Sequence, residues 1–597
     1  MWSTEEAKFI HGIGRGDLDF LDINEAGDLE IKLEDASITI PDLIDRVREE
    51  NKSKNGYTST FTVRFPQLIT EQVEKIRKTF SSYMKSAGYN GDYIPLYPVK
   101  VNQQSDCVTA VLESDVEYGL EAGSKSEMLL IMRAVFEDKS RLIVANGTKD
   151  REYLEMARAA AEQGHRVLVS LESVDEAKLA IDCLIPGKLE LALRVKPYVH
   201  SSGHWSHSGG RDSKFGLSVH DMIEVANILA DSPLGEDVRA IHAHLGSQLT
   251  NLEKNMADYG KFMAEVFFSL RKRGLTGLRA IDIGGGVPAD YESLFEQDPI
   301  SVFVNTMLDA IQDVCEKEGA NKHPDIMTEA GRAVTAKSSA IIVKVVDVRS
   351  VFPEVDASSP EMKDFGQKIE QISNTATLYD IWTDLKHAAP TGNIDELHTR
   401  EKRVALFKQL VRRRVVEENL EVPEELHEWL FVPDYVAIGN FSVFNSCFDF
   451  VLVDQYFPVI PISGHDRQPA TTVRLADLTC DSDGEISPFV IRRREDRTLV
   501  TKDVRPLTAS KSNSTTGIPV TDVNNLDYFL VALTGAYQDV LEADHNLFGD
   551  LPDVVLREED GKMSIEWIHG AQAMTEILDD VGFEEIKEID DPYFELK

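Results

Sequence analysis

The feature that most constrains the fold is a regular alternation of short apolar, β-rich runs with helical segments between residues 93 and 332. Most of the intervening segments carry apolar residues at helical spacing, as in SEMLLIMRAVFED and REYLEMARAAAEQG. Strands that alternate with helices predict parallel βαβ units, and eight such units match the size of a (β/α)8 barrel. A doubly wound open sheet is the alternative that the pattern leaves open. The eight runs are 93–101, 117–122, 141–147, 166–173, 189–196, 238–247, 278–286 and 324–332.

Polar residues that could take part in catalysis or binding lie where these predicted strands end. In a barrel of this kind the catalytic groups collect at the carboxyl ends of the strands. The sequence therefore predicts an active site at that end of the barrel. The residues at or just past the strand ends are Lys100, Glu121, Asn146, Glu172, Arg194, His244, Gly284, Gly285, Gly286, Glu329 and Arg332.

The segments on either side of the predicted barrel show different patterns of apolar and polar residues. Short alternating runs within 28–66 and strand-like runs after 435 predict a mostly β domain built from both chain ends. Residues 355–430 are polar and helical, which indicates an inserted helical bundle. The predicted division is residues 1–90 for the N-terminal part of the β domain, 91–340 for the barrel, 355–430 for the insertion, and 341–354 with 431–597 for the rest of the β domain.

Composition excludes several classes of function. A formal net charge of −39 disfavours nucleic acid as a partner, because phosphate binding requires a basic surface. The sequence has neither an apolar run long enough to span a membrane nor the beginning of a secretion signal. The five cysteines are scattered without a CxxC pair, which predicts a reducing, cytoplasmic location and neither a disulfide framework nor a structural zinc site.

Lys100 and the glycine run suggest a phosphorylated cofactor. A lysine at the end of a buried strand is costly unless it is charge-paired, deprotonated or covalently occupied, and lysines of lowered pKa are the usual attachment points of pyridoxal phosphate. A snorkelling lysine is the ordinary structural explanation. Gly284, Gly285 and Gly286 follow another strand, and such a turn lets backbone N–H groups approach a phosphate, although a tight turn without a ligand is equally compatible.

Two further motifs supply residues that could contact the ring and the phosphate of such a cofactor. His244 in HAHLGSQ could stack on a planar cofactor with Ser247 on its phosphate; zinc binding by the two histidines lacks a third ligand. In TEAGR, Glu329 could hold a pyridinium proton and Arg332 a phosphate, whereas a plain surface ion pair is the ordinary explanation. A lysine, a glycine turn, a ring and an acid–arginine pair at one barrel end are what pyridoxal phosphate requires.

The same motifs resemble those of the biosynthetic arginine decarboxylases, pyridoxal-phosphate enzymes with an alanine-racemase-type barrel. The resemblance implies decarboxylation of L-arginine to agmatine and carbon dioxide, feeding polyamine biosynthesis. It also implies a homodimer or tetramer that shares active sites across the subunit interface, and a magnesium requirement. The matching segments include FLDINEAGDLEI, YPVKVNQ, GLEAGSKSEM, HAHLGSQL, DIGGGVPADY, TEAGRAVTA, GNFSVFNS, DQYFPVIPI, LTCDSDG and GAYQDVLEADHNLFGD.

The resemblance assigns a role to each site residue. Lys100 would be the Schiff-base lysine, His244 would stack on the pyridine ring and Glu329 would pair with its nitrogen. Cys480 would protonate the carbanion and Asp481 would bind the distal cationic group of the substrate, both reaching the site from the neighbouring subunit. The phosphate would be held by Ser247, Gly284, Gly285, Gly286, Arg332 and Tyr537, with Glu121 and Arg194 as further cofactor contacts.

One segment departs from the family. After NFSVFNS the family continues Pro-Asp-any-Trp, whereas this chain has Phe448, Asp449, Phe450 and Val451. Asp449 is kept as an expected substrate-binding residue, while the changed apolar neighbours bear on side-chain selectivity.

Alternatives remain at the level of function. A decarboxylase of ornithine, lysine or diaminopimelate would use the same residues, and an amino-acid racemase would use the same cofactor but would not need Cys480. A non-catalytic regulator of polyamine metabolism would not need Lys100. The TCDSDG turn could also hold a buried filler cysteine or a calcium loop, but its glycine is not at the position that an EF-hand requires.

Overall fold

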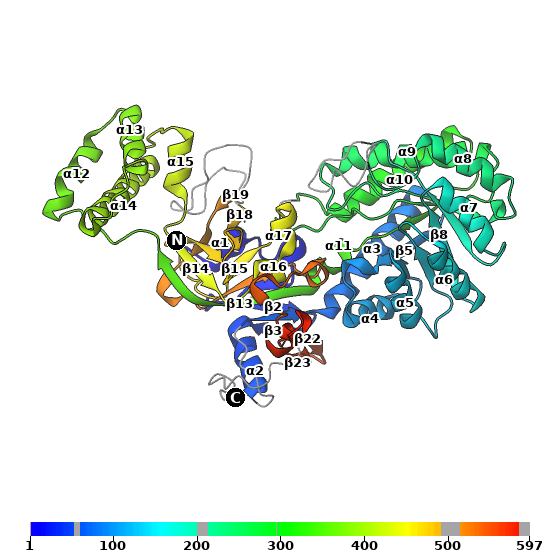
Figure 1. Ribbon diagram of the computed structural model, residues 1–597, viewed down its shortest axis with the longest axis horizontal. Helices are drawn as coiled ribbons and strands as arrows, with labels where there is room; N and C mark the ends of the chain where they lie inside the picture. The colour runs from blue at the N-terminus through cyan, green and yellow to red at the C-terminus, as the bar shows by residue number, and fades with distance from the viewer. Residues whose placement is uncertain are drawn as a thin grey trace.

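The computed structural model describes residues 2–52, 60–199, 213–293, 295–490, 514–572 and 574–583. Figure 1 shows a barrel ringed by helices on the right, a β domain in the centre, and a helical body at the far left. Among the described residues, no helix combines the length and the apolar character needed to cross a membrane.

The barrel is closed and all of its strands are parallel to their neighbours. Its order is β10-β11-β12-β5-β6-β7-β8-β9, so the eight-strand prediction is confirmed and the open-sheet alternative is wrong. Small and medium apolar residues from most of these strands, such as Leu96, Ala192 and Ala280, fill the interior. The strands are β5 (Tyr93–Pro98), β6 (Gly119–Ala122), β7 (Leu142–Ala145), β8 (Arg166–Leu171), β9 (Glu190–Arg194), β10 (Val238–His242), β11 (Ala280–Asp282) and β12 (Asp325–Thr328).

Helices cover the outside of the barrel, and several of them begin at residues whose side chains cap the helix. Ser124, Asp150 and Ser173 each accept a hydrogen bond from the backbone N–H three residues on, which satisfies a donor that the helix itself leaves unpaired. Helix α3 (Pro66–Ala87) precedes the first barrel strand, yet its face at Ile69 and Phe80 packs into the barrel core. The other helices are α4 (Ser105–Ser114), α5 (Lys125–Ala134), α6 (Arg151–Glu162), α7 (Val174–Cys183), α8 (Val219–Ala230), α9 (Leu252–Lys272) and α10 (Pro299–Lys317).

The second domain is mostly β and combines both ends of the chain, as the sequence predicted. Strand β4 (Phe61–Arg64) pairs antiparallel with β13 (Ser339–Ser350) and parallel with β22 (Asp553–Glu559). The other strands of this ten-stranded sheet are β14 (Tyr435–Gly439), β15 (Val459–Pro461), β16 (Thr471–Ala476), β17 (Glu485–Ile486), β20 (Ile518–Val520), β21 (Tyr528–Ala532) and β23 (Lys562–His569). Two smaller sheets hold β1 (Leu21–Ile23), β2 (Leu29–Leu33) and β3 (Ala36–Thr39), and β18 (Pro488–Val490) with β19 (Ser514–Thr516).

The helical insertion packs around an apolar core of its own, centred on Leu406, Phe407 and Trp382. It consists of α12 (Pro360–Gln371), α13 (Thr375–Lys386), α14 (Ile394–Glu417) and α15 (Glu424–Phe431) and lies at the end of the molecule opposite the barrel (Figure 1). The remaining helices are α1 (Thr4–His11), α2 (Ile40–Lys52), α11 (Arg332–Thr335), α16 (Val443–Ser446), α17 (Phe448–Val453), α18 (Gln538–Leu541) and α19 (Met574–Asp580).

Candidate active site

Lys100 lies in a short 3-10 turn directly after β5, at the carboxyl end of the barrel. Its Nζ is 2.7 Å from Oε2 of Glu121, which is almost fully buried in the neighbouring strand β6. Burial disfavours the ammonium form, but the carboxylates of Glu121 and Glu329 outweigh it and raise the pKa of Lys100. Of the three states that the sequence left open, the structure shows the charge-paired one. The side chain is 46% exposed, so the amine can be reached from outside.

Glu329 follows β12 and lies deep in the barrel mouth. Asn146 Nδ2 donates a hydrogen bond of 2.7 Å to Glu329 Oε1, and His242 Nε2 is 3.7 Å from Oε2. Burial and the carboxyl groups of Asp282 and Glu121 raise the pKa of Glu329 well above its usual range, while burial lowers the pKa of His242. The Glu329 carboxyl thus lies between an amide donor and a neutral imidazole, where it could pair with a ring nitrogen.

His244 is oriented by the glycine turn. The backbone N–H of Gly285 donates to His244 Nδ1 at 3.0 Å, which assigns the ring proton to Nε2. Burial and the charges of Lys100 and Arg194 lower the pKa of His244 to about 3, so the ring is neutral. A Cβ on Gly285 would lie 2.7 Å from the carbonyl oxygen of Glu329, and Gly284 adopts φ +66°, so ring and turn fit together only with glycine.

Arg332 is held from several sides. Its Nε donates to Ser247 Oγ at 3.1 Å and its Nη1 to the Tyr291 hydroxyl at 3.0 Å. Its guanidinium lies 4.7 Å from the ring centroid of Tyr537, a cation–π distance. The buried carboxylate of Asp449 is 3.5 Å from Nη2. Asp449 was expected to bind substrate, and in the structure its carboxylate contacts this arginine.

Arg194 lies at the end of β9, where its Nη1 donates to Glu172 Oε1 at 2.7 Å and its guanidinium lies over the ring of Phe215. Nearby, the fully buried Lys149 pairs with Glu176 at 2.7 Å. Of these groups, Arg194 contributes to the lowered pKa of His244, after burial and the charge of Lys100.

Cys480 and Asp481 stand apart from this group. They lie in the turn between β16 and β17, which pair antiparallel as a hairpin. Asp477 supports the turn by accepting hydrogen bonds from the Thr479 N–H and the Val443 N–H, both at 2.8 Å. Cys480 is exposed, whereas the other four cysteines are buried, so it lies on the surface of the chain.

The barrel thus brings together the groups predicted for the cofactor and leaves Cys480 and Asp481 on a surface turn. Sequence reasoning missed Tyr291, although it stands in the quoted segment DIGGGVPADY. It noted Asn146 at a strand end without giving it a role, and it considered His242 only as a zinc ligand. His242, Asp282 and Glu329 do place their ligand atoms within 4.8 Å of one another.

Comparisons with known proteins agree with this arrangement. Residues 73–336 match the family model described as pyridoxal-dependent decarboxylase, pyridoxal binding domain. The biosynthetic arginine decarboxylase of Chromobacterium violaceum is 30% identical over 97% of this chain and 92% of its own length. That of Bacteroides thetaiotaomicron is 28% identical over 98% of this chain and 92% of its own length.

Solved structures give the same result. The crystal structure of the biosynthetic arginine decarboxylase SpeA from Campylobacter jejuni superposes with a TM-score of 0.74 at 27% identity, covering 96% of this chain and 92% of that one. Diaminopimelate decarboxylase from Helicobacter pylori, solved with L-lysine, has a TM-score of 0.56 at 15% identity over 89% of this chain and 99% of its own. At 15% identity, the similarity to diaminopimelate decarboxylase concerns the fold alone.

Proposed function

Because the chain belongs to the family of biosynthetic arginine decarboxylases, we propose that it converts L-arginine to agmatine and carbon dioxide with pyridoxal 5′-phosphate as cofactor. The observation that supports this most is the meeting of Lys100, Glu121, His244 and Glu329 at one end of the barrel with the glycine turn. The product would enter polyamine biosynthesis.

The residues present fit the phosphate of this cofactor. The glycine turn lets a phosphate approach the backbone because it carries no side chains, although the N–H groups of Gly284 and Gly285 already donate to Asp282 and His244. Arg332 and Ser247 offer a guanidinium and a hydroxyl that are already in contact. Tyr537 packs against the guanidinium. These groups would hold the phosphate, as the sequence predicted.

The residues also fit the ring. Lys100 would hold the cofactor covalently through Nζ, His244 would lie against the ring face and Glu329 would hold the proton on the ring nitrogen. When bound, the cofactor supplies an electron-accepting ring for the electrons left behind as the α-carboxylate departs. Asn146 orients the Glu329 carboxyl through its hydrogen bond to Oε1, and His242 lies on the side of Oε2.

Glu121 is the group placed to take up the proton of the Lys100 ammonium. A lysine reacts as the free amine, whereas the Lys100 ammonium is favoured here by its carboxylate neighbours. Glu121 Oε2, at 2.7 Å, is placed to accept the proton when the amine reacts.

We place Cys480 and Asp481 in the active site of a neighbouring subunit, within a homodimer or tetramer. Their exposure on the β16–β17 turn supports this, because a surface turn of one copy is free to approach the barrel mouth of another. There Cys480 Sγ would return a proton to the substrate α-carbon, and Asp481 would pair with the guanidinium of arginine.

Magnesium does not fit the one cluster with metal-like spacing in the described part of the chain. His242, Asp282 and Glu329 include an imidazole, which Mg²⁺ disfavours, and Glu329 Oε1 is already bonded to Asn146. We propose instead that this cluster faces the ring nitrogen of the cofactor. We also propose a cytoplasmic location, which the free state of all five cysteines supports.

A product assay tests the function. Purified protein supplied with pyridoxal phosphate should release carbon dioxide and agmatine from L-arginine, with kcat/KM higher than for L-ornithine, L-lysine or diaminopimelate. Lys100→Ala should abolish turnover. Full activity of Lys100→Ala would reject the proposal, and a higher kcat/KM for ornithine or lysine would move the enzyme to the alternative basic amino acid.

A further inference from the structure

Four buried polar side chains lie at the carboxyl end of the barrel core, next to its apolar filling. Each stands two positions after a residue of that filling, so the alternation of a strand turns each toward the barrel interior. Only Glu329 has a chemical role in the proposed function. The four are Ser170 after Leu168, His242 after Ala240, Asp282 after Ala280 and Glu329 after Met327.

His242 is at the centre of these side chains. Its Nδ1 is 3.1 Å from Ser170 Oγ, across the intervening strand β9, and its Nε2 is 3.7 Å from Glu329 Oε2. Asp282 is in register with His242 on the neighbouring strand β11 and lies beside Glu329 as well. Burial first, and then the charge of Arg194, lowers the pKa of His242 well below its usual range. The imidazole is therefore neutral and offers a single N–H.

The direction of the hydrogen bond with Ser170 decides which nitrogen of His242 carries the proton. If the Ser170 hydroxyl donates to Nδ1, the imidazole proton lies on Nε2 and faces the carboxyl oxygens of Glu329 and Asp282, so both hydrogens have an acceptor. In the opposite arrangement, Nδ1–H donates to Ser170, and the buried hydroxyl hydrogen finds no other acceptor in the described part of the chain. The first arrangement is therefore the more stable one.

The carboxyl groups that face His242 share one negative charge at most. Ligand atoms of Asp282 and Glu329 lie within 4.8 Å of each other in a buried place, and two carboxylates so close do not both ionise. Among the described residues, His242 Nε2 and Asp282 Oδ2 make no hydrogen bond, which is costly for buried polar atoms. At 3.7 Å, a small movement of the Glu329 carboxyl would bring Oε2 within reach of the His242 N–H.

We propose that Ser170 and His242 are positioning residues of the decarboxylation. Ser170 fixes the proton of His242 on Nε2, and His242 donates a hydrogen bond to Glu329 Oε2 in the cofactor-loaded protein. With Asn146 on Oε1, Glu329 then has a donor on each oxygen, which stabilises the carboxylate that pairs with a protonated ring nitrogen. Asp282 stays uncharged beside them. The inference rests on the proposed function, because it takes Glu329 as the partner of the ring nitrogen.

Nitrogen NMR of the protein loaded with pyridoxal phosphate, isotope-labelled at the ring nitrogen, tests the proposal, because the resonance distinguishes a protonated from an unprotonated ring. At pH 8 the wild type should show a protonated ring. His242→Leu has a similar volume but no donor, so it should lower the protonated share by about half or more. It should also lower kcat for arginine about tenfold, with KM within about twofold. His242→Gln, whose amide donor reaches about as far as Nε2, should restore most of both losses.

Ser170→Ala keeps the imidazole but no longer holds its proton on Nε2, and it should lower the protonated share and kcat in the same direction. The matched control is His427→Gln, a buried histidine in α15 of the insertion, which should keep the protonated ring and the kcat of the wild type.

A fully protonated ring in folded His242→Leu overturns the inference and leaves the proposed function intact. If His242→Leu does not fold, a fully protonated ring in Ser170→Ala overturns it equally. An unprotonated ring in the active wild type also rejects the inference alone, whereas a wild type that binds no pyridoxal phosphate rejects the proposed function and the inference together.

Discussion

Asn146 and Glu329 are 183 positions apart in the sequence, yet Asn146 Nδ2 donates a hydrogen bond of 2.7 Å to Glu329 Oε1. Asn146 follows β7 and Glu329 follows β12, and these strands are not neighbours in the barrel. The bond therefore crosses the barrel mouth and forms only when the barrel closes. It fixes the carboxyl group proposed to hold the ring nitrogen of the cofactor.

Asn146→Ala should lower kcat for arginine about tenfold with little change in KM, because losing a hydrogen bond to an ionisable group costs about 1.5–3 kcal/mol. The loss should fall on kcat because Asn146 acts through Glu329 and not on the substrate. Steady-state kinetics with saturating cofactor provides the measurement. Asn227→Ala, an exposed asparagine on α8, is the control. Unchanged kcat in Asn146→Ala would show that Glu329 needs no such support.

Gly285→Ala should destabilise the protein by about 1–3 kcal/mol, because the new methyl group would lie 2.7 Å from the Glu329 carbonyl oxygen in a packed region. It should also weaken cofactor binding, since the turn must move away from His244. Denaturant unfolding and cofactor titration measure the two effects. Gly392→Ala adds a methyl group in open space and should change stability by less than about 0.5 kcal/mol. Similar stability of the two variants would refute the close packing.

Tyr291→Phe should raise the Kd for pyridoxal phosphate about tenfold, because Arg332 loses a 3.0 Å acceptor and its guanidinium is less well oriented. Cofactor titration followed by absorbance measures the change. The control is Tyr89→Phe, which also removes a buried hydroxyl, one that donates to the Pro324 carbonyl before β12. That variant should lose stability but keep its cofactor affinity. Equal Kd values for the two variants would contradict a role for Tyr291.

Lys100→Ala and Cys480→Ala should each be inactive alone but active when co-expressed. If the site is shared, half of randomly assembled dimers are hybrids with one intact site of two, so about a quarter of wild-type activity should return. Tagged subunits and native mass spectrometry establish that hybrids form. Hybrids without recovered activity would place Cys480 in the site of its own subunit or outside the chemistry.

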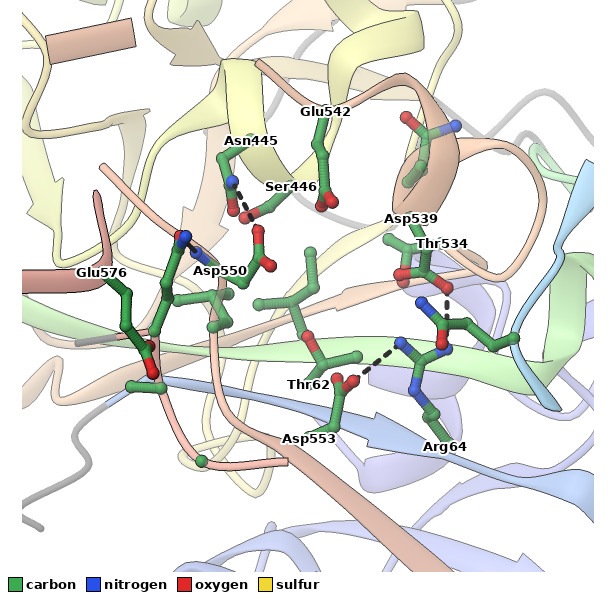
Figure 2. Close-up of a pocket in the computed structure, with 17 residues that line it drawn as sticks. Thr62, Arg64, Asn445, Ser446, Thr534, Asp539, Glu542, Asp550, Asp553 and Glu576 are labelled. Atoms are coloured by element: carbon green, nitrogen blue, oxygen red, sulfur yellow. Dashed lines mark hydrogen bonds and ion pairs between the residues drawn. The ribbon is translucent and has the colours of Figure 1, made fainter. Parts of the chain in front are cut away.

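Burial and the carboxylates of Asp550 and Asp539 raise the pKa of Glu542, which follows α18, to about 8 (Figure 2). Between pH 4.5 and 8 the folded protein keeps a proton on Glu542 that the unfolded chain has lost, so this group makes folding less favourable as pH rises. Glu542→Gln should therefore raise Tm at pH 8 and leave it unchanged at pH 4, where both states carry the proton. A rise at pH 4 as large as at pH 8 would contradict this origin.

Much of the fold could be predicted from residue patterns because the signals are local. The eight apolar runs correspond to the eight barrel strands, since apolar runs bounded by helical periodicity specify buried parallel strands wherever they occur. Gly285 could be named as a candidate because a run of three glycines follows a strand, although a tight turn without a ligand fits the same pattern. The polar residues at strand ends could be grouped at one site because all parallel strands of a barrel end at the same face.

The sequence by itself thus determined the elements, their order and the chemical groups at one barrel end. Only the tertiary structure decided which of these groups touch. Barrel closure joins Asn146 to Glu329, and the fold of both chain ends surrounds a cavity with carboxylates from α18, β22 and α19. It also decided the charge of Lys100, whose pKa is raised and not lowered, because Glu121 and Glu329 approach it through space. Such contacts and pKa shifts depend on distance and burial, which no spacing along the chain encodes.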